Sequence, residues 1–405
     1  MESALAAVDS LAREQLARWG VPGLAVGVVA DGRTAARAWG VASLDTREPV
    51  TPETTFRVAS VTKPFTAALA RAVLDLDEPL ETPAGPVSSR LLLAHMGGLR
   101  CEAAEPLDGF ATVSDAVAGS GLRAWGEPGR LWVYSNAGYW LVGAAVERAT
   151  GLRFEEAMRA HVLAPRGLGA ATGFGSPSAA GHEPVEPEAV EHRPYPVTDY
   201  PAPRRPSGGL VSSVGDLLRF AETWWDDEEA RAVVARRPGG LQGAGWMLDR
   251  RDGIELLLHP GSAAGFQSVL VLVPERRVAV AALANSARGQ AAFTGVVDAL
   301  LEHAAGVPPG APAIVDLPAG ELEPFAGRYA GLDEEAGVGV VAGGLSVQLS
   351  QRDPFTHEVT TFPPFVGRPI GDGAFAVVEG EASGSHFDFP EAFFRLGSVL
   401  AERVP

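Results

Sequence analysis

The hydrophobic pattern at the start of the chain predicts a helix followed by an antiparallel pair of strands. Residues 2–19 place leucine and valine at nearly helical spacing between polar positions. Residues 23–29 are a short apolar run, and the dipeptide Asp31-Gly32 after it is a strong signal for a hairpin turn. Residues 33–41 complete the pair, so we expect a β-hairpin beside an N-terminal helix.

A second, strongly helical segment lies at residues 65–76 and is preceded directly by Pro64. Proline is tolerated only in the first turn of a helix. We therefore expect Ser60 at or just before the helix start, with Lys63 one turn further along. Residues three apart on a helix share a face, so these two side chains are expected to lie close together.

The middle of the chain differs in pattern from both ends. Residues 88–170 are predicted to be mainly helical, whereas residues 171–206 are rich in Pro, Gly and Glu without periodicity, which is typical of a loop that lines a site or is mobile. The elements that follow are a helix at 213–225, strand-like runs at 254–259, 267–273 and 277–283, and a helix at 292–305. The two ends thus predict one antiparallel sheet flanked by helices, with a helical domain inserted between them.

The composition changes at residues 306–320, where proline and glycine predominate as in a linker. The residues that follow are short strand-like runs separated by glycine turns, which predict a small β-rich domain with a closed sheet. We therefore expect an α/β (α+β) domain at 1–305, with its helical insertion at about 88–206. The linker at 306–320 is then followed by the β-rich domain at 321–405.

Charge and composition exclude several functions. The chain has 405 residues, 46% of them hydrophobic, and a net charge of -17, so it can bury a large core but lacks the basic surface of a nucleic-acid binder. Anionic membranes are disfavoured for the same reason. The single cysteine excludes internal disulfides, and the histidines show no ligand spacing, so we expect no metal and no cofactor. The opening residues lack the features of a signal peptide, which predicts a cytoplasmic protein.

Lysine usage points to the first chemical candidate. Of the 33 basic residues, Lys63 is the only lysine and all others are arginine. Arginine can replace lysine as a surface cation, but its pKa, above about 12, prevents it from releasing a proton. Lys63 is therefore a candidate for proton transfer. The alternative is that a single lysine remains in the sequence by chance.

Ser60-x-x-Lys63 at a helix start has the composition of a nucleophile and its base. A serine hydroxyl needs an adjacent base, and a buried lysine can serve because burial lowers its pKa. The helix N-terminus can also stabilise an oxyanion formed at Ser60. The structural alternative is an N-cap serine beside a surface lysine.

Tyr134-Ser135-Asn136 and His259-Pro260-Gly261-Ser262 are two further candidates. A tyrosine whose pKa is lowered by a nearby ammonium can carry a proton between nucleophile and leaving group. The glycine lets a ligand approach the backbone, and the Ser262 N–H can donate to an oxyanion. The structural alternatives are a core tyrosine, an asparagine helix cap and a turn histidine.

In this order the three elements resemble the serine β-lactamase and penicillin-binding-protein superfamily. The resemblance is nearest to its class C β-lactamase-like branch of esterases, D-aminopeptidases, transacylases and peptide cyclases. It covers about residues 1–305 and extends to the stretches VPGLAVGVV, TFRVASVTKPFTAALA, LLLAHMGGL, SGGLVSSVGDLLRF and GSAAGFQSVLVLVP. Residues 320–405 more loosely resemble the lipocalin-like β-domain that follows the catalytic domain in some members.

The resemblance implies a role for each candidate. Ser60 becomes acylated, Lys63 and Tyr134 share the general acid and base work, and Asn136 orients Lys63 and the acyl amide. His259 occupies the position of a lysine in the β-lactamases. The resemblance also implies that the backbone N–H groups of Ser60 and of Ser262, which follows Gly261, form the oxyanion hole.

The histidine is a departure from the family, because a histidine with a pKa of about 6.5 is mostly neutral at pH 7 and binds a substrate carboxylate less well than lysine. We therefore expect hydrolysis of a small-molecule or peptide ester or amide through an acyl-enzyme. One alternative is transfer of the acyl group from an ester or thioester to an amine, as in a peptide cyclase, with a carrier protein as partner. The other is a true β-lactamase or DD-peptidase.

Overall fold

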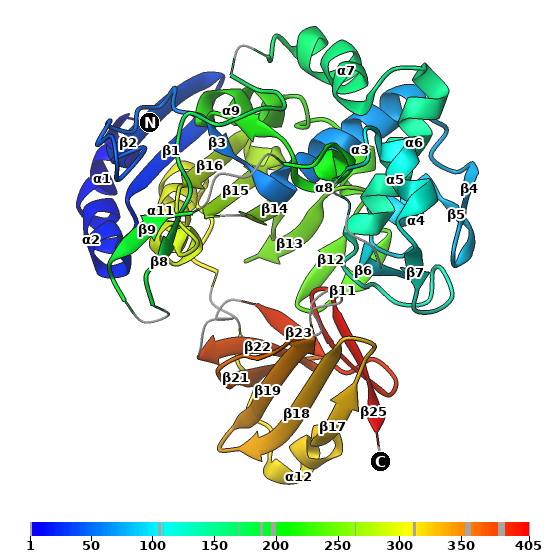
Figure 1. Cartoon of the computed structure of the whole chain (residues 1–405). Coiled ribbons are helices and arrows are strands. Elements are labelled where there is room, and N and C mark those ends of the chain that lie inside the picture. Colours follow the sequence, from blue (N-terminus) through cyan, green and yellow to red (C-terminus); the bar gives the residue numbers. More distant parts are fainter. Residues whose placement is uncertain are drawn as a thin grey trace.

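The computed structural model describes residues 2–103, 107, 109–169, 171–186, 189–195, 200–263, 265–310, 313–352, 358–379 and 385–404. The predicted fold class is confirmed, because an antiparallel sheet flanked by helices carries a helical insertion and is followed by a small β-barrel (Figure 1). None of the helices in the described part of the chain combines the length and apolar character needed to cross a lipid bilayer.

The central sheet has eight antiparallel strands drawn from both ends of residues 1–305. The order is β11-β12-β13-β14-β15-β16-β1-β2. The strands are β1 (Gly23–Ala30), β2 (Arg33–Gly40), β11 (Ala235–Arg237), β12 (Gly240–Gln242), β13 (Met247–Arg251), β14 (Ile254–Ala263), β15 (Phe266–Val273) and β16 (Val278–Ala284). Since β1 pairs with β16, the first strand closes against the last one of the domain.

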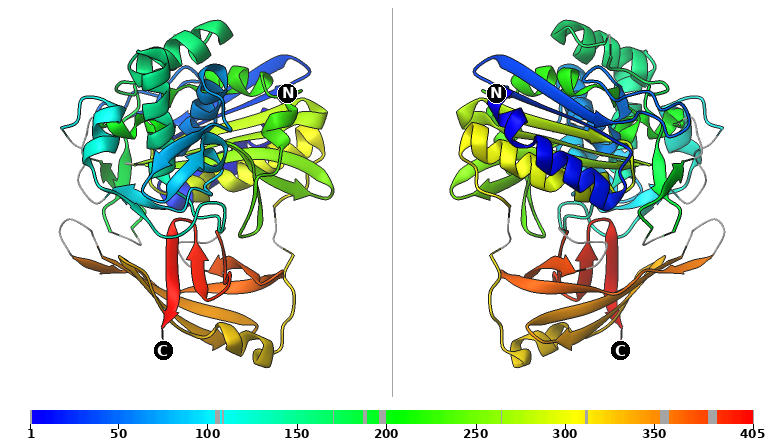
Figure 2. Two further views of the ribbon diagram at one scale, coloured as in Figure 1. Left: turned by 90° about the vertical axis from the view of Figure 1, so that its right-hand side faces the viewer. Right: turned by 90° about the vertical axis from the view of Figure 1, so that its left-hand side faces the viewer.

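Two helical layers cover the sheet. On one face lie α1 (Glu2–Ala7), α2 (Asp9–Trp19) and α11 (Gly289–Ala305), whose apolar side chains form one core with the sheet (Figures 1 and 2). The predicted N-terminal helix is interrupted by a turn at Val8. Asp9 begins the second helix, and its carboxylate accepts a hydrogen bond from the Trp39 indole on β2, which ties that helix to the sheet.

The other face supports the helical region that holds the site. Its helices are α3 (Thr62–Val73), α4 (Ser89–Leu93), α5 (Val113–Gly119), α6 (Asn136–Thr150), α7 (Phe154–Met158), α8 (Arg205–Gly208), α9 (Val214–Glu222) and α10 (Glu228–Arg231). The helix α3 is buried along most of its length, and its Phe65 ring stacks on Phe220 of α9 at 3.5 Å. Burial of this kind fixes α3 in the core that the helices on this face share with the sheet.

Four short strand pairs connect these helices. They are β3 (Phe56–Arg57) with β10 (Val211–Ser212), β4 (Pro79–Thr82) with β5 (Gly85–Ser88), β6 (Leu99–Ala103) with β7 (Leu122–Ala124), and β8 (His182–Pro184) with β9 (His192–Pro194). The last pair lies inside the segment that we expected to be a loop. Two buried histidines anchor it: His182 bonds to the Asn285 carbonyl and His192 to the Ser286 hydroxyl.

The C-terminal strands form a ring of eight, closed by pairing between β18 and β19. A short helix, α12 (Ala319–Leu322), precedes them. The strands are β17 (Gly327–Ala330), β18 (Glu334–Val341), β19 (Gly344–Arg352), β20 (Val359–Thr361, which extends the sheet beside β19), β21 (Phe365–Gly371), β22 (Ala374–Glu379), β23 (His386–Asp388), β24 (Phe393–Leu396) and β25 (Val399–Val404). Aromatic rings fill the interior; the Phe375 and Phe387 rings, for example, stack at 5.1 Å.

Candidate active site

Ser60 lies at the junction between strand β3 and helix α3. It is the middle residue of a single 3-10 turn, Ala59–Val61, that leads directly into the helix. Ala59 has a positive φ of 47°, which is a strained conformation for a residue with a side chain. The Thr62 hydroxyl donates to the Ala59 carbonyl at 2.7 Å, and the Ser268 hydroxyl donates to the Val58 carbonyl at 2.7 Å. These two bonds hold the bend that presents the serine.

Lys63 is fully buried one turn into α3 and forms three polar contacts. Its Nζ lies 3.2 Å from Ser60 Oγ, and it donates to Asn136 Oδ1 and to the Ser207 carbonyl, both at 2.8 Å. Burial lowers the pKa of Lys63 to about 7. A neutral amine has two N–H groups, which these two acceptors occupy. The remaining lone pair then faces the serine hydroxyl.

Tyr134 lies just before helix α6, and its hydroxyl donates to Ser60 Oγ at 2.9 Å. Its ring stacks on the buried His95 at 4.3 Å, and His95 Nδ1 accepts from the Ser135 N–H. We expected a nearby ammonium to lower the pKa of the tyrosine. That expectation is wrong, because burial raises the pKa of Tyr134 above its usual range. The phenol therefore stays protonated.

Asn136, the first residue of α6, links the lysine to a carboxylate that sequence reasoning missed. Its Oδ1 accepts from Lys63, and its Nδ2 donates to Glu102 Oε1 at 2.7 Å. The carboxylate accepts only, so this bond fixes the orientation of the asparagine amide. Glu102 follows the stretch LLLAHMGGL and belongs to no catalytic pattern that we recognised. The Ser207 carbonyl was missed as well, since any residue can supply a carbonyl.

The end of strand β14 forms the opposite wall of the site. β13 pairs with β14 only as far as Leu258, which leaves residues 259–263 with β15 as their one strand neighbour. A Cβ on Gly261 would lie 2.4 Å from the Val58 carbonyl and 3.1 Å from Ser60 N. Only glycine therefore allows this strand to approach the turn that carries the serine. Ser262 directly follows this close contact.

His259 is fully buried in this wall. Its Nδ1 bonds to the Pro260 carbonyl at 2.7 Å, and its Nε2 has no hydrogen-bond partner among the described residues. Burial lowers the pKa of His259 to about 3, and the nearby Lys63 acts in the same direction. The ring is therefore neutral across the physiological range, and it cannot act as a fixed cation for a substrate carboxylate.

The site residues open into a cleft of about 690 Å³. Ser60, Tyr134, Asn136, His259, Gly261 and Ser262 all line it, and Lys63 contacts it through Ser60 and Asn136. Part of the wall comes from the C-terminal barrel, which contributes Asp333, Glu334, Gln351, Arg352, Thr360, Phe362 and Ser398. Among the described residues, no group of three His, Cys, Asp or Glu side chains is arranged to hold a metal ion.

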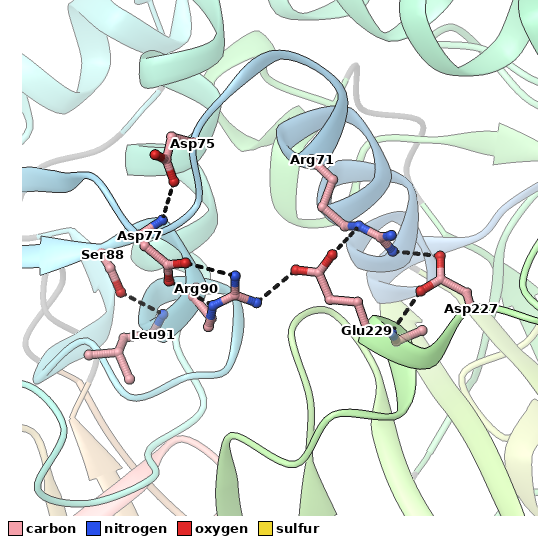
Figure 3. Close-up of polar contacts among 9 residues, drawn as sticks. Arg71, Asp75, Asp77, Ser88, Arg90, Leu91, Asp227 and Glu229 are labelled. Carbon is pink, nitrogen blue, oxygen red and sulfur yellow. Dashed lines mark hydrogen bonds and ion pairs between the residues drawn. The ribbon is translucent and has the colours of Figure 1, made fainter.

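The far end of α3 contains a different kind of polar cluster (Figure 3). Arg71 donates to Asp227 at 2.8 Å and contacts Glu229 at 3.2 Å, and Arg90 bridges Glu229 and Asp77. The side chains other than Asp77 border a cavity of about 430 Å³. The cluster ties α3 to α10 and α4.

The family model that matches this chain is Beta-lactamase, over residues 8–305. The chain belongs to the Beta-lactamase family. The match spans all seven predicted site residues, from Ser60 to Ser262. Enzymes of the Beta-lactamase family are serine hydrolases, and this chain is an enzyme of that acyl-transfer class.

Three similar proteins place the chain within the Beta-lactamase family. It is 28% identical over 366 residues to penicillin-binding protein 4 of Amycolatopsis lactamdurans, covering 76% of this chain and 93% of that one. The crystal structure of SurE, which is also known with D-Leu, matches 100% of both chains with 27% identity and a TM-score of 0.76. The D-amino acid amidase of Ochrobactrum anthropi SV3 matches 74% of this chain and 98% of its own, at 25% identity and a TM-score of 0.63.

Proposed function

We propose that this protein forms an acyl-enzyme on Ser60 and hydrolyses an amide or ester bond next to a D-amino acid residue in a small molecule or short peptide. The observation that carries the proposal is the convergence of Lys63 Nζ and Tyr134 OH on Ser60 Oγ, at 3.2 and 2.9 Å. The D-residue is supported by the names of its relatives, which include a D-amino acid amidase, D-aminopeptidases and SurE with D-Leu.

In the proposed first step, neutral Lys63 accepts the proton of the Ser60 hydroxyl as Oγ attacks the substrate carbonyl carbon. Its pKa of about 7 suits a general base at neutral pH. Tyr134 stays protonated, and it is therefore the better candidate for general acid, donating its proton to the leaving amine or alkoxide and regaining one from Lys63. The developing oxyanion accepts hydrogen bonds from the backbone N–H groups of Ser60 and Ser262.

In the second step, water attacks the ester carbonyl of the acyl-enzyme and releases the acid. Asn136 holds Lys63 through both steps and is available to bind the acyl amide. The neutral His259 argues against tight binding of a penicillin-like carboxylate, because it supplies no permanent positive charge. This favours amide and ester substrates over a true β-lactamase or DD-peptidase role.

Transfer to an amine is a second candidate. Barrel residues line the same cleft as Ser60, and this part of the wall offers a surface on which an amine acceptor can bind. The names of the relatives give no support to a carrier-protein partner.

A fluorophosphonate probe tests the proposed nucleophile. We expect its mass on the peptide that contains Ser60, and no labelling of a folded Ser60→Ala variant. Labelling of another residue, or none in folded wild type, would contradict the proposal.

A panel of D- and L-amino acid amides then tests the substrate class, and faster turnover of the L series would refute the D-preference. Repeating the reaction on an acyl thioester with and without an added amine separates hydrolysis from transfer.

A further inference from the structure

The segment that carries Tyr134 has no regular secondary structure between β7 and α6, so its position depends on contacts with other parts of the chain. Three consecutive N–H groups show where these contacts are made. The Val133 N–H donates to the His95 carbonyl at 3.0 Å, and the Ser135 N–H donates to His95 Nδ1 at 3.1 Å. The Tyr134 N–H donates to the Gly397 carbonyl at 3.2 Å. The middle contact therefore comes from the C-terminal barrel.

Gly397 and Ser398 form the two-residue turn between β24 and β25. Gly397 has a φ of 58°, which suits the tight hairpin turns that require the left-handed region. Ser398 lines the cleft beside Ser60. Figure 2 shows the red C-terminal strands reaching up to the main domain. The tip of this hairpin thus lies at the candidate active site.

Arg395, two residues before Gly397, forms a second link to the same segment. Its side chain is almost fully buried and donates to the Trp132 carbonyl at 2.8 Å. The guanidinium lies over the Trp132 ring, 5.9 Å from its centroid. Asp388 on β23 pairs with the guanidinium through both carboxylate oxygens, which fixes the plane of its fork. The arginine thereby holds the backbone two residues before the tyrosine.

We propose that Arg395 and the β24–β25 turn position Tyr134, so that the C-terminal barrel is part of the acylation apparatus. Arg395 is a positioning residue, since it acts through the Trp132 carbonyl and touches no reacting atom. His95 holds one side of the tyrosine segment and the barrel holds the other. This inference rests on the proposed function of Ser60 and Tyr134.

The test measures acylation of Ser60 by a small ester or fluorophosphonate, whose reaction depends less on substrate-binding contacts than that of a peptide. We expect Arg395→Met to slow acylation by about 10- to 100-fold, because small displacements of a catalytic group have effects of this size. The matched control is Arg403→Met. Arg403 is also an arginine of the barrel that donates to backbone carbonyls, but its partners, Pro324 and Ala326, lie within the C-terminal region. We expect that control to acylate normally.

A double-mutant cycle with Tyr134→Phe distinguishes positioning from general destabilisation. If Arg395 acts through the tyrosine hydroxyl, Arg395→Met causes little further loss in the Tyr134→Phe background. Equal losses in both backgrounds would overturn the proposal. Arg395→Lys keeps a donor but loses the bidentate pairing with Asp388, and we expect it to retain part of the acylation rate. It replaces Arg395→Met in the test if that variant fails to fold.

Failure of this inference can be told apart from failure of the proposed function. If wild type is not acylated on Ser60, the proposed function fails and the positioning role fails with it. If Ser60 is acylated but Arg395→Met behaves like Arg403→Met, only the positioning role is wrong.

Discussion

The two ends of helix α3 place basic residues in opposite surroundings. Lys63, near the start, is fully buried, and its pKa is lowered to about 7 without a carboxylate in direct contact. Arg71, in the last turn, is partly exposed and paired with Asp227 and Glu229. Burial without a counter-ion favours the neutral amine, whereas paired carboxylates retain a permanent cation. One helix thus carries a lysine whose surroundings favour the neutral amine at one end and a paired, permanently charged arginine at the other.

The largest effect is expected when lysine and arginine are exchanged at the two ends of α3. We expect Lys63→Arg to lower the rate of Ser60 acylation by about 10³-fold or more, because guanidinium cannot accept the serine proton. Single-turnover acylation with a small ester measures the effect, and circular dichroism checks the fold. Arg71→Lys at the other end of the helix is the matched control and should acylate normally. Normal acylation by Lys63→Arg would remove the base from the mechanism.

The pH dependence of Ser60 acylation tests whether Lys63 reacts as a neutral amine. Since Lys63 must be neutral to accept a proton, acylation should fall about tenfold for each pH unit below about 7 and level off above it. The pKa of His259, lowered to about 3, predicts no additional step near pH 6 to 7 from that residue. A stopped-flow profile between pH 5 and 9, with a non-ionising ester, measures both features. A rate independent of pH would contradict the assignment.

Glu102 provides an intermediate test, because its hydrogen-bond link to Lys63 runs through Asn136, while its charge acts on the Lys63 pKa from a distance and raises it. We expect Glu102→Ala to slow acylation by about tenfold, since the freed asparagine amide can rotate away from the lysine. Glu102→Gln keeps an acceptor oxygen and should lose less. Comparison of the two variants in the same single-turnover assay checks this order. Equal losses in the two variants, both of which lack the charge, would show that the charge matters more than the orientation of Asn136.

The smallest effect is expected at the exposed end. Arg90→Gln removes contacts to Asp77 and Glu229 but leaves Arg71 paired. Partly exposed ion pairs contribute about 0.5–1 kcal/mol, so the free energy of unfolding should fall by about that amount. Urea unfolding at low and high salt measures the loss, which should shrink as salt rises. Slower acylation in this variant would mean that the two ends of α3 are coupled.

Much of the fold could be predicted from local patterns. The hairpin around Asp31-Gly32, the apolar strands and the helix after Pro64 all depend on residues close in sequence, and the structure confirms them. The turn at Val8 was not predicted, and the hydrogen bond that ties the second helix to β2 joins Asp9 to Trp39, which is distant in sequence. The closed sheet of the C-terminal region was expected, but the pairing of β17 with β25, its first and last strands, joins residues far apart in the sequence and is marked by no local pattern.

The residues of the candidate site also divide into those that a local sequence pattern marks and those that only the folded structure brings into contact. Ser60, Lys63, Tyr134, Asn136, His259, Gly261 and Ser262 stand in recognisable stretches, and the structure brings them around one cleft. Glu102, the Ser207 carbonyl and Arg395 act through contacts made only after folding, so no motif marks them. The direction of the Tyr134 pKa was predicted wrongly for the same reason: the extent of its burial is a property of the tertiary structure.

Aromatic side chains fill the interior of the barrel, and apart from Phe362 the barrel residues at the cleft lie outside that core. We therefore expect the framework of the barrel to tolerate replacement of the cleft residues other than Phe362. Evolution, or an engineer, can change substrate preference at this rim while leaving the proton-transfer groups of the other domain untouched. Diversification within this lineage is then expected to concentrate on the barrel's rim.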